Sequence, residues 1–257
     1  AVPQNNPELR VLRKMGVMVL SYPEAVAEVS KDYSLVAVSG THGKSTTTAM
    51  LSLVMIEGGL DPTVIVGTKL KEVGGGNVRM GRYEVQKFKS SKVQRGTESS
   101  KVPKFKSSKA QNYFVVEADE YAGSFLNYSP AVGIITNVDK DHLDYYKSYA
   151  NVKSAFMKFV GSVGGVLVLN EDDPGLRSLK VKIEKVAKKN STTLLWYSLK
   201  DSVAKRLKKV LKVPGEHNVS NALAVYVLGR ELGLKSDVIL EALGSYEGAW
   251  RRMEYKR

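Results

Sequence analysis

The chain has 257 residues, of which 43% are hydrophobic and 25% charged, and it contains no cysteine. Disulfides, thiolate metal sites and a cysteine nucleophile are therefore excluded, and no apolar run approaches the roughly 18 residues that a membrane span needs. The formal net charge of +13 could attract a nucleic acid or an anionic membrane surface.

Residues 1–29 predict a helix near 7–15, a short strand at Val17–Leu20 and a helix that starts at Pro23, since proline is well placed in a first helical turn. No strand that could pair with Val17–Leu20 precedes it in the sequence.

A strand, a glycine-containing loop and a helix are predicted at 35–39, 40–44 and 45–57. Gly40 and Gly43 would let the backbone turn sharply and approach a ligand, and the N–H groups at the helix start would face an anion. The spacing is G-x-x-G-K-S, a partial match to the common phosphate-loop pattern. We interpret the loop as a binding site for a nucleotide triphosphate, the alternative being a glycine-rich turn without a ligand.

Within this loop and helix start, two side chains carry the predicted chemistry. Lys44 can reach the outer phosphates, and the Ser45 hydroxyl can hold Mg²⁺.

A basic segment interrupts the alternating pattern after a glycine-rich turn at 74–77. Residues 82–111 contain nine Lys or Arg and two Glu, and the sequence FKSSK occurs in it twice. Its composition predicts a disordered or loosely attached insertion at 84–111. A basic arm that binds an acidic partner and a short two-stranded flap are the alternatives.

Polar side chains follow two further predicted strands. The strand Tyr113–Val116 runs into Glu117, and the strand Ala131–Thr136 runs into a segment that contains His142. Open α/β sheets bind ligands at the carboxyl ends of their strands, and a carboxylate suits Mg²⁺. The alternatives are a solvated acidic loop and a histidine that is merely paired with nearby aspartates.

The remaining elements continue the alternation, with a helix near 149–160, a strand at 166–169, a helix near 175–189 and a strand at 193–197. The whole pattern predicts an α/β fold with a mainly parallel sheet and helices on both faces.

A last amphipathic helix is predicted to open near Pro214. In it, Asn218 and Asn221 are three residues apart and share a face. Their amides could read an adenine edge or could simply cap the helix.

Five motifs, in this order, resemble those of the central domain of the Mur ligases, the ATP-dependent amide-forming enzymes of peptidoglycan precursor synthesis. They are GTHGKSTTT at 40–48, EADE at 117–120, TNVDKDHLD at 136–144, NEDDP at 170–174 and PGEHNVSNALA at 214–224.

Particular residues favour one branch of this family. His42 and the GSFL sequence at 123–126 are most similar to the branch that joins L-alanine to UDP-N-acetylmuramate, whereas EADEY at 117–121 is shared with the murein-peptide ligase. Phe156 and Met157 stand where several family members have a carbamylated lysine, which also resembles the alanine-adding branch.

The resemblance implies a domain plan and a set of site residues. Residues 30–248 would form a P-loop NTPase-like central domain, residues 1–29 the remnant of an N-terminal UDP-sugar-binding domain, and residues 249–257 a hinge to an absent C-terminal domain. The catalytic residues would be Lys44, Glu117 and His142. Ser45 would hold one Mg²⁺ and His142 a second, and Glu117 would lie near both. ATP would contact Gly40, Thr41, His42, Gly43, Lys44, Ser45, Thr46, Asn218, Asn221 and Arg252, and the second substrate Asn137 and Ser124.

The implied function is an ATP- and Mg²⁺-dependent ligase that joins L-alanine to UDP-N-acetylmuramate through an acyl phosphate in the cytoplasm. No membrane or nucleic-acid partner is expected, and another chain could supply the missing domains. A murein-peptide ligase, an ATP-binding module without turnover and a basic interaction protein that uses 84–111 remain open. We predict that Lys44→Ala abolishes tight ATP binding and leaves the fold intact.

Overall fold

The computed structural model describes residues 2–3, 5–70, 75–82 and 112–248. The predicted insertion at 84–111, the predicted hinge at 249–257 and the predicted ATP contact Arg252 lie outside the described residues.

A seven-stranded sheet forms the centre of the described structure, in the order β3-β2-β4-β1-β5-β6-β7. Every neighbouring pair is parallel except β2 and β3, which are antiparallel. The strands are β1 (Ser34–Ser39), β2 (Thr63–Ile65), β3 (Val78–Arg79), β4 (Tyr113–Glu117), β5 (Val132–Ile135), β6 (Val166–Asn170) and β7 (Thr193–Tyr197). The predicted mainly parallel sheet is confirmed.

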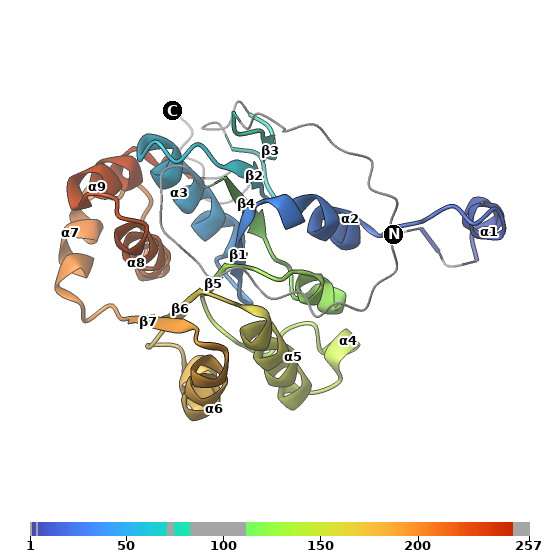
Figure 1. Ribbon diagram of the computed structural model, residues 1–257. Coiled ribbons are helices and arrows are strands. Elements are labelled where there is room, and N and C mark those ends of the chain that lie inside the picture. Colours follow the sequence, from blue (N-terminus) through green and yellow to red (C-terminus); the bar gives the residue numbers. More distant parts are fainter. Residues whose placement is uncertain (1, 4, 71–74, 83–111, 249–257) are drawn as a thin grey trace.

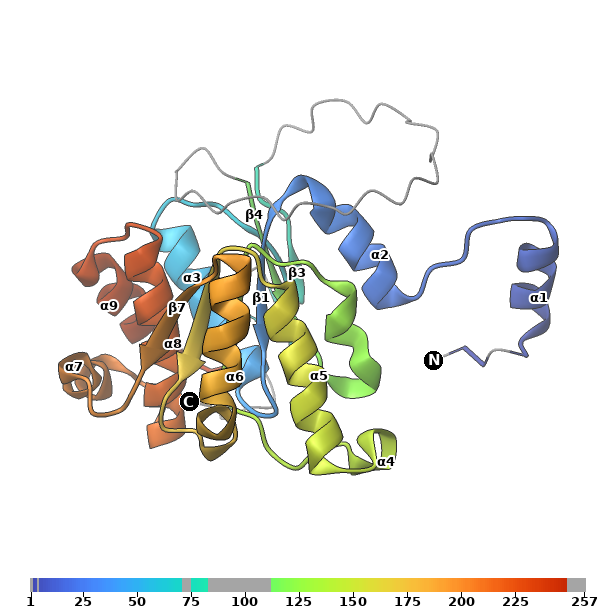
Figure 2. The same cartoon turned by 60° about the horizontal axis from the view of Figure 1, so that its bottom comes forward.

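Helices cover both faces of the sheet, as predicted (Figure 1). One face packs against α3, α7, α8 and α9, and the other against α2, η3, α5 and α6. The helices are α1 (Pro7–Lys14), α2 (Tyr22–Val29), α3 (Lys44–Glu57), α4 (Leu143–Tyr146), α5 (Tyr149–Ser162), α6 (Pro174–Asn190), α7 (Ser202–Val210), α8 (Glu216–Glu231) and α9 (Ser236–Ser245), with 3₁₀ segments η1 (Ser30–Asp32) and η3 (Tyr121–Asn127). The view in Figure 2 shows α5 and α6 side by side in front of the strands.

The central strand β1 shows why the strands read as continuous apolar runs. Val36 and Val38 belong to the core beneath α3 and α8, whereas Leu35 and Ala37 belong to the core beneath α5. Successive side chains of a strand point to opposite faces, so a parallel strand covered on both sides is apolar at every position.

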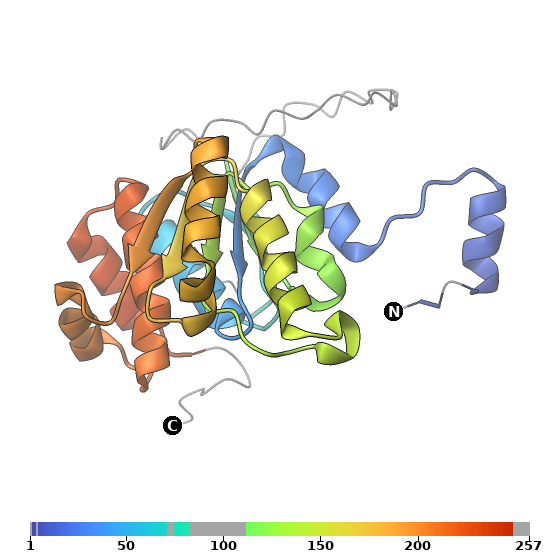
Figure 3. The same cartoon turned by 90° about the horizontal axis from the view of Figure 1, so that it is seen from below.

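The N-terminal segment differs from the prediction. Val17–Leu20 is not a strand but irregular chain with exposed side chains. The strand prediction was wrong because an isolated stretch of strand needs a neighbour to satisfy its backbone. Helix α1 buries none of its residues, and it lies apart from the remaining elements (Figure 3).

Two helices of the C-terminal third, α7 and α9, have no counterpart among the elements predicted above. Helix α7 lies in the basic stretch 201–213 and turns Ala204 and Leu207 into the core. No helix within the described residues is both long enough and apolar enough to cross a membrane.

The loop that follows β5 is fastened to α5 and α6 through one residue, Val138. Its N–H donates to the Asp173 carboxylate (3.1 Å), and its carbonyl accepts from the Tyr149 hydroxyl (2.9 Å). Asp173 also accepts from Leu176 N at 2.7 Å, which caps α6, while burial raises the pKa of Asp173. A Cβ at Gly175 would lie 2.0 Å from the Val138 carbonyl oxygen, so only glycine allows this approach.

We expect Gly175→Ala to destabilise the fold by about 1–3 kcal/mol, because the added methyl group would overpack rigid backbone. Gly161 in α5 is the matched control, since a Cβ there would meet nothing within 4 Å. Gly161→Ala should stabilise the protein by roughly 0.5–1 kcal/mol. Urea denaturation of both variants measures the difference, and equal effects would contradict the proposed contact.

Candidate functional site

The phosphate loop joins β1 to α3 at the centre of the sheet. Gly40 has φ +137° and Gly43 has φ +84°, a region that favours glycine. A Cβ at Gly40 would lie 2.0 Å from Thr136 Oγ1, and one at Gly43 would lie 2.6 Å from Asn221 Oδ1. The loop is thus held closely between the segment after β5 and helix α8.

The segment after β5 also holds the loop backbone. Asn137 Oδ1 accepts from His42 N at 2.8 Å, and Asn137 Nδ2 donates to the His42 carbonyl at 2.9 Å. Thr41 Oγ1 accepts from Asp139 N at 2.9 Å. The amide of Asn137 therefore fixes the loop. Its predicted contact with a substrate stays a prediction.

Lys44 and Ser45 begin α3 and point toward carboxylates at the end of β4 and just after it. The Lys44 ammonium donates to both Glu120 carboxylate oxygens, at 2.7 and 3.0 Å, and the Ser45 hydroxyl donates to Glu117 Oε1 at 2.7 Å. The other Glu117 oxygen accepts from Gly67 N at 2.6 Å. The structure thus brings Lys44, Ser45 and Glu117 together, as the sequence predicted.

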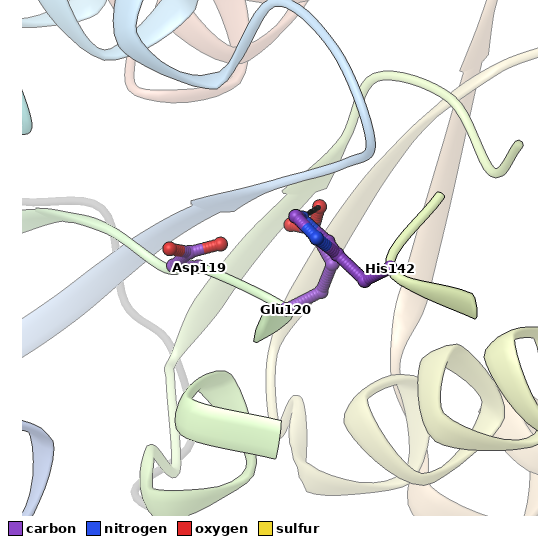
Figure 4. A group of neighbouring side chains, drawn as sticks. All are labelled: Asp119, Glu120 and His142. Carbon is purple, nitrogen blue, oxygen red and sulfur yellow. Dashed lines mark ion pairs between the residues drawn. The ribbon is translucent and has the colours of Figure 1, made fainter. Parts of the chain in front are cut away.

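His142 lies beside this group at the start of α4. Its Nε2 is 3.6 Å from Glu120 Oε1, and the ligand atoms of Asp119, Glu120 and His142 all lie within 4.8 Å of one another. Figure 4 shows the Glu120 and His142 side chains meeting at their tips, with the Asp119 carboxylate to one side. The imidazole is also packed edge-on against the Tyr121 ring, with centroids 4.9 Å apart.

Glu120 is the main site residue that the sequence reasoning missed. Its side chain is only 2% exposed, and burial raises its pKa while the Lys44 ammonium opposes that rise. The EADE motif contained the signal, but it has three carboxylates and does not indicate which of them turns inward. Ala122 and Gly123, both with positive φ, bend the chain directly after it.

The donor set fits a magnesium ion. Mg²⁺ prefers carboxylate and hydroxyl oxygens together with phosphates and water. Ser45 and Glu117 already lie in contact, while Glu120 lies in contact with Lys44 and beside His142. The predicted ligands therefore lie in two neighbouring groups, Ser45 with Glu117 and His142 with Glu120. The predicted binding of two metal ions there stays a prediction.

A cavity of about 180 Å³ adjoins the phosphate loop and is lined by residues from α3, α8 and the chain that flanks them. Gly43 and Thr46 line it from the loop side, and Asn218 and Asn221 from α8. The predicted shared face of the two asparagines is confirmed. Asn218 Nδ2 donates to the Pro214 carbonyl at 2.7 Å, so one of its two polar groups is used within the helix start.

Two predicted site residues show no direct side-chain link to this cluster. His42 is exposed at the tip of the loop, and Ser124 lies in η3, where its carbonyl accepts from the Asn127 amide at 2.9 Å. Phe156, at one of the two positions compared above with a lysine of other family members, is buried in the apolar core. The roles predicted for His42 and Ser124 stay predictions.

The fold and the site define a nucleotide-binding α/β domain, with a glycine loop at the end of the central strand and carboxylates on the neighbouring strand. The chain matches the Mur ligase middle domain over residues 38–229. It therefore belongs to the Mur ligase family, whose members are ATP-dependent ligases of peptidoglycan synthesis.

Individual relatives agree with this assignment. The chain is 35% identical to the UDP-N-acetylmuramate–L-alanine ligase of Aquifex aeolicus over 280 aligned positions, which cover 100% of this chain and 54% of that protein. The solved UDP-N-acetylmuramate–alanine ligase of Thermotoga maritima superposes with a TM-score of 0.69 at 26% identity, covering 99% of this chain and 55% of the other. The chain thus spans about half the length of the curated relatives it matches.

A solved murein-peptide ligase is similar in fold. The UDP-N-acetylmuramate:L-alanyl-γ-D-glutamyl-meso-diaminopimelate ligase of Neisseria meningitides superposes with a TM-score of 0.71 at 22% identity, covering 97% of this chain and 78% of the other.

Proposed function

We propose that this chain is the central part of an ATP-dependent ligase that joins L-alanine to UDP-N-acetylmuramate. The observation that carries the proposal is the convergence of Lys44, Ser45, Glu117 and His142 at one edge of the sheet. The 35% identity to a UDP-N-acetylmuramate–L-alanine ligase along the whole chain supports the choice of substrates. ATP, UDP-N-acetylmuramate and L-alanine would meet at this edge, in the cytoplasm.

In the proposed reaction, ATP phosphorylates the substrate carboxylate, and the amino group of the amino acid displaces phosphate from the acyl phosphate. Phosphoryl transfer depends mainly on positioning and on neutralising charge. Lys44 would donate to the outer phosphates. The N–H groups at the start of α3 would donate to phosphate oxygens. Asn137 would keep the loop backbone in the shape that presents these donors.

Mg²⁺, when bound, would neutralise the phosphate charge. Ser45 would hold one ion and His142 a second, with Glu117 near both. The cavity beside Gly43 and Thr46 would take the nucleoside, where Asn218 and Asn221 offer amide groups to the base. Residues 1–29 would belong to a UDP-sugar-binding domain, and residues 249–257 would lead into an amino-acid-binding domain.

A murein-peptide ligase is the second candidate, because the EADEY motif at 117–121 is shared with that enzyme. Tyr121, the last residue of the motif, packs against the proposed metal ligand His142. ATP-dependent phosphate release with UDP-N-acetylmuramate and either L-alanine or the tripeptide as acceptor separates the two. Release with L-alanine alone supports the first candidate, and release only with the tripeptide supports the second.

Calorimetry of ATP binding tests the site itself. We expect micromolar binding that strengthens when Mg²⁺ is added, because phosphate and metal are held by adjacent groups. ATP binding without phosphate release, with either acceptor, would favour a nucleotide-binding module. No ATP binding in either buffer would contradict the proposed site.

A further inference from the structure

The ammonium group of Lys44 has no spare N–H bond in this structure. It lies within hydrogen-bond distance of four acceptor atoms: the carbonyl oxygens of Gly40 at 2.9 Å and Thr41 at 3.3 Å, and both carboxylate oxygens of Glu120 at 2.7 and 3.0 Å. A lysine ammonium has three donors and no more. A phosphate oxygen that binds Lys44 must therefore displace one of these acceptors.

Glu120 is the acceptor that a phosphate would replace. The Gly40 and Thr41 carbonyls are neutral and belong to the loop, whereas the Glu120 carboxylate is an anion. Two anions held beside one ammonium repel each other, so the incoming phosphate and Glu120 compete for Lys44.

Once Lys44 binds phosphate, the Glu120 carboxylate cannot readily be hydrated in its place. Its side chain is 2% exposed, and its backbone carbonyl accepts a hydrogen bond from the hydroxyl of the buried Tyr146. A buried carboxylate that loses its cation is strongly unfavourable. Two neighbours could share a cation with it: His142, whose Nε2 is 3.6 Å from Glu120 Oε1, and Asp119, whose ligand atom lies within 4.8 Å of theirs.

We propose that nucleotide binding at this loop is an exchange of ions: the phosphate takes Lys44 from Glu120, and Glu120 accepts in its place the divalent cation that accompanies the nucleotide. This inference rests on the proposed function, because it requires the loop to bind a nucleotide. It assigns Glu120 the role of linking metal binding to phosphate binding, so that ATP without metal binds weakly.

Glu120→Gln tests the exchange. The amide keeps the size of the side chain and removes its charge, so ATP in EDTA should bind the variant about 10-fold more tightly than the wild type, as expected for releasing one charged hydrogen bond. In excess MgCl₂ the variant should gain less from the metal. The ratio of the metal-bound to the metal-free affinity should fall by about 10-fold or more. Calorimetry in both buffers gives the four dissociation constants.

Glu171→Gln is the matched control. Glu171 also pairs with a lysine, Lys180, at 2.7 Å. The Glu171 side chain is 46% exposed and the Lys180 side chain 37% exposed, and this pair includes no residue of the phosphate loop. Glu171→Gln should leave the ATP affinity in both buffers within about 2-fold of the wild-type value, because an exposed ion pair contributes little. Thermal denaturation of both variants checks that each is folded.

The outcomes separate this inference from the proposed function. If the wild type and Glu120→Gln bind ATP with the same metal-free affinity, or if the variant binds more weakly, the exchange is overturned while the nucleotide site stands. If neither protein binds ATP in either buffer, the site itself fails, and the exchange fails with it.

Discussion

Replacing Lys44 with alanine is expected to weaken ATP binding by at least about 100-fold, because the variant loses charged hydrogen bonds to phosphate that each contribute roughly 1.5–3 kcal/mol. The structure adds a second effect, which the sequence did not indicate. Glu120, with a side chain only 2% exposed, would lose its partner. An unpaired buried charge is destabilising by about 3 kcal/mol, so we no longer expect Lys44→Ala to leave the fold unperturbed.

A double variant separates the two effects. Lys44→Ala combined with Glu120→Gln removes both charges, so its thermal stability should return close to that of the wild type while ATP binding stays weak. Calorimetry and thermal denaturation of the single and double variants measure this. ATP affinity that survives in Lys44→Ala would show that the loop is not the phosphate site.

Replacing His142 with alanine is expected to lower kcat in the presence of Mg²⁺ by about 100-fold, since a lost metal ligand removes part of a stabilisation of several kcal/mol. ATP affinity should change by less than about 10-fold, because the variant keeps Lys44 and the N–H groups at the start of α3, which are the proposed donors to the phosphates. The measurement is steady-state turnover across a range of Mg²⁺ concentrations, with a parallel binding titration.

The backbone at this position requires its own control. His142 has φ +52°, a conformation that costs alanine roughly 1–2 kcal/mol and that asparagine tolerates better. His142→Asn should therefore be more stable than His142→Ala and have a similarly low kcat. Turnover restored by asparagine, with its Mg²⁺ dependence unchanged, would mean that the imidazole is needed only to shape the loop.

Much of the sheet could be predicted because its information is local. The apolar runs at 35–39, 113–116 and 193–197 correspond to β1, β4 and β7 within one residue at each end. The glycine loop and the Lys-Ser start of α3 could also be predicted, since adjacent residues encode the backbone conformation that they need. Val17–Leu20 failed for the opposite reason: its composition suits a strand, but pairing depends on a neighbour.

The candidate site was only partly predictable, and Glu117 and Glu120 show why. Glu117 is the last residue of β4 and Glu120 follows it, and the sequence analysis selected Glu117 for its place at the strand end. Glu120 lies 76 positions from Lys44 in the chain and meets it because β4 is the neighbour of β1 in the sheet. The positive φ of Ala122 and Gly123 then folds the following segment back. Asn137 is a further case, since only its contact with His42 shows that its amide holds the loop.

The sequence by itself determined the α/β class, the phosphate loop and the resemblance to the Mur ligases, because each of these is recorded in short runs of neighbouring residues. The tertiary structure decided which carboxylate neutralises Lys44, how Val138 fastens the histidine-bearing loop, and that the asparagines of α8 line a cavity beside Gly43. These contacts join residues far apart in the chain, and they depend on strand order and on buried charge, which a local pattern of residues does not contain.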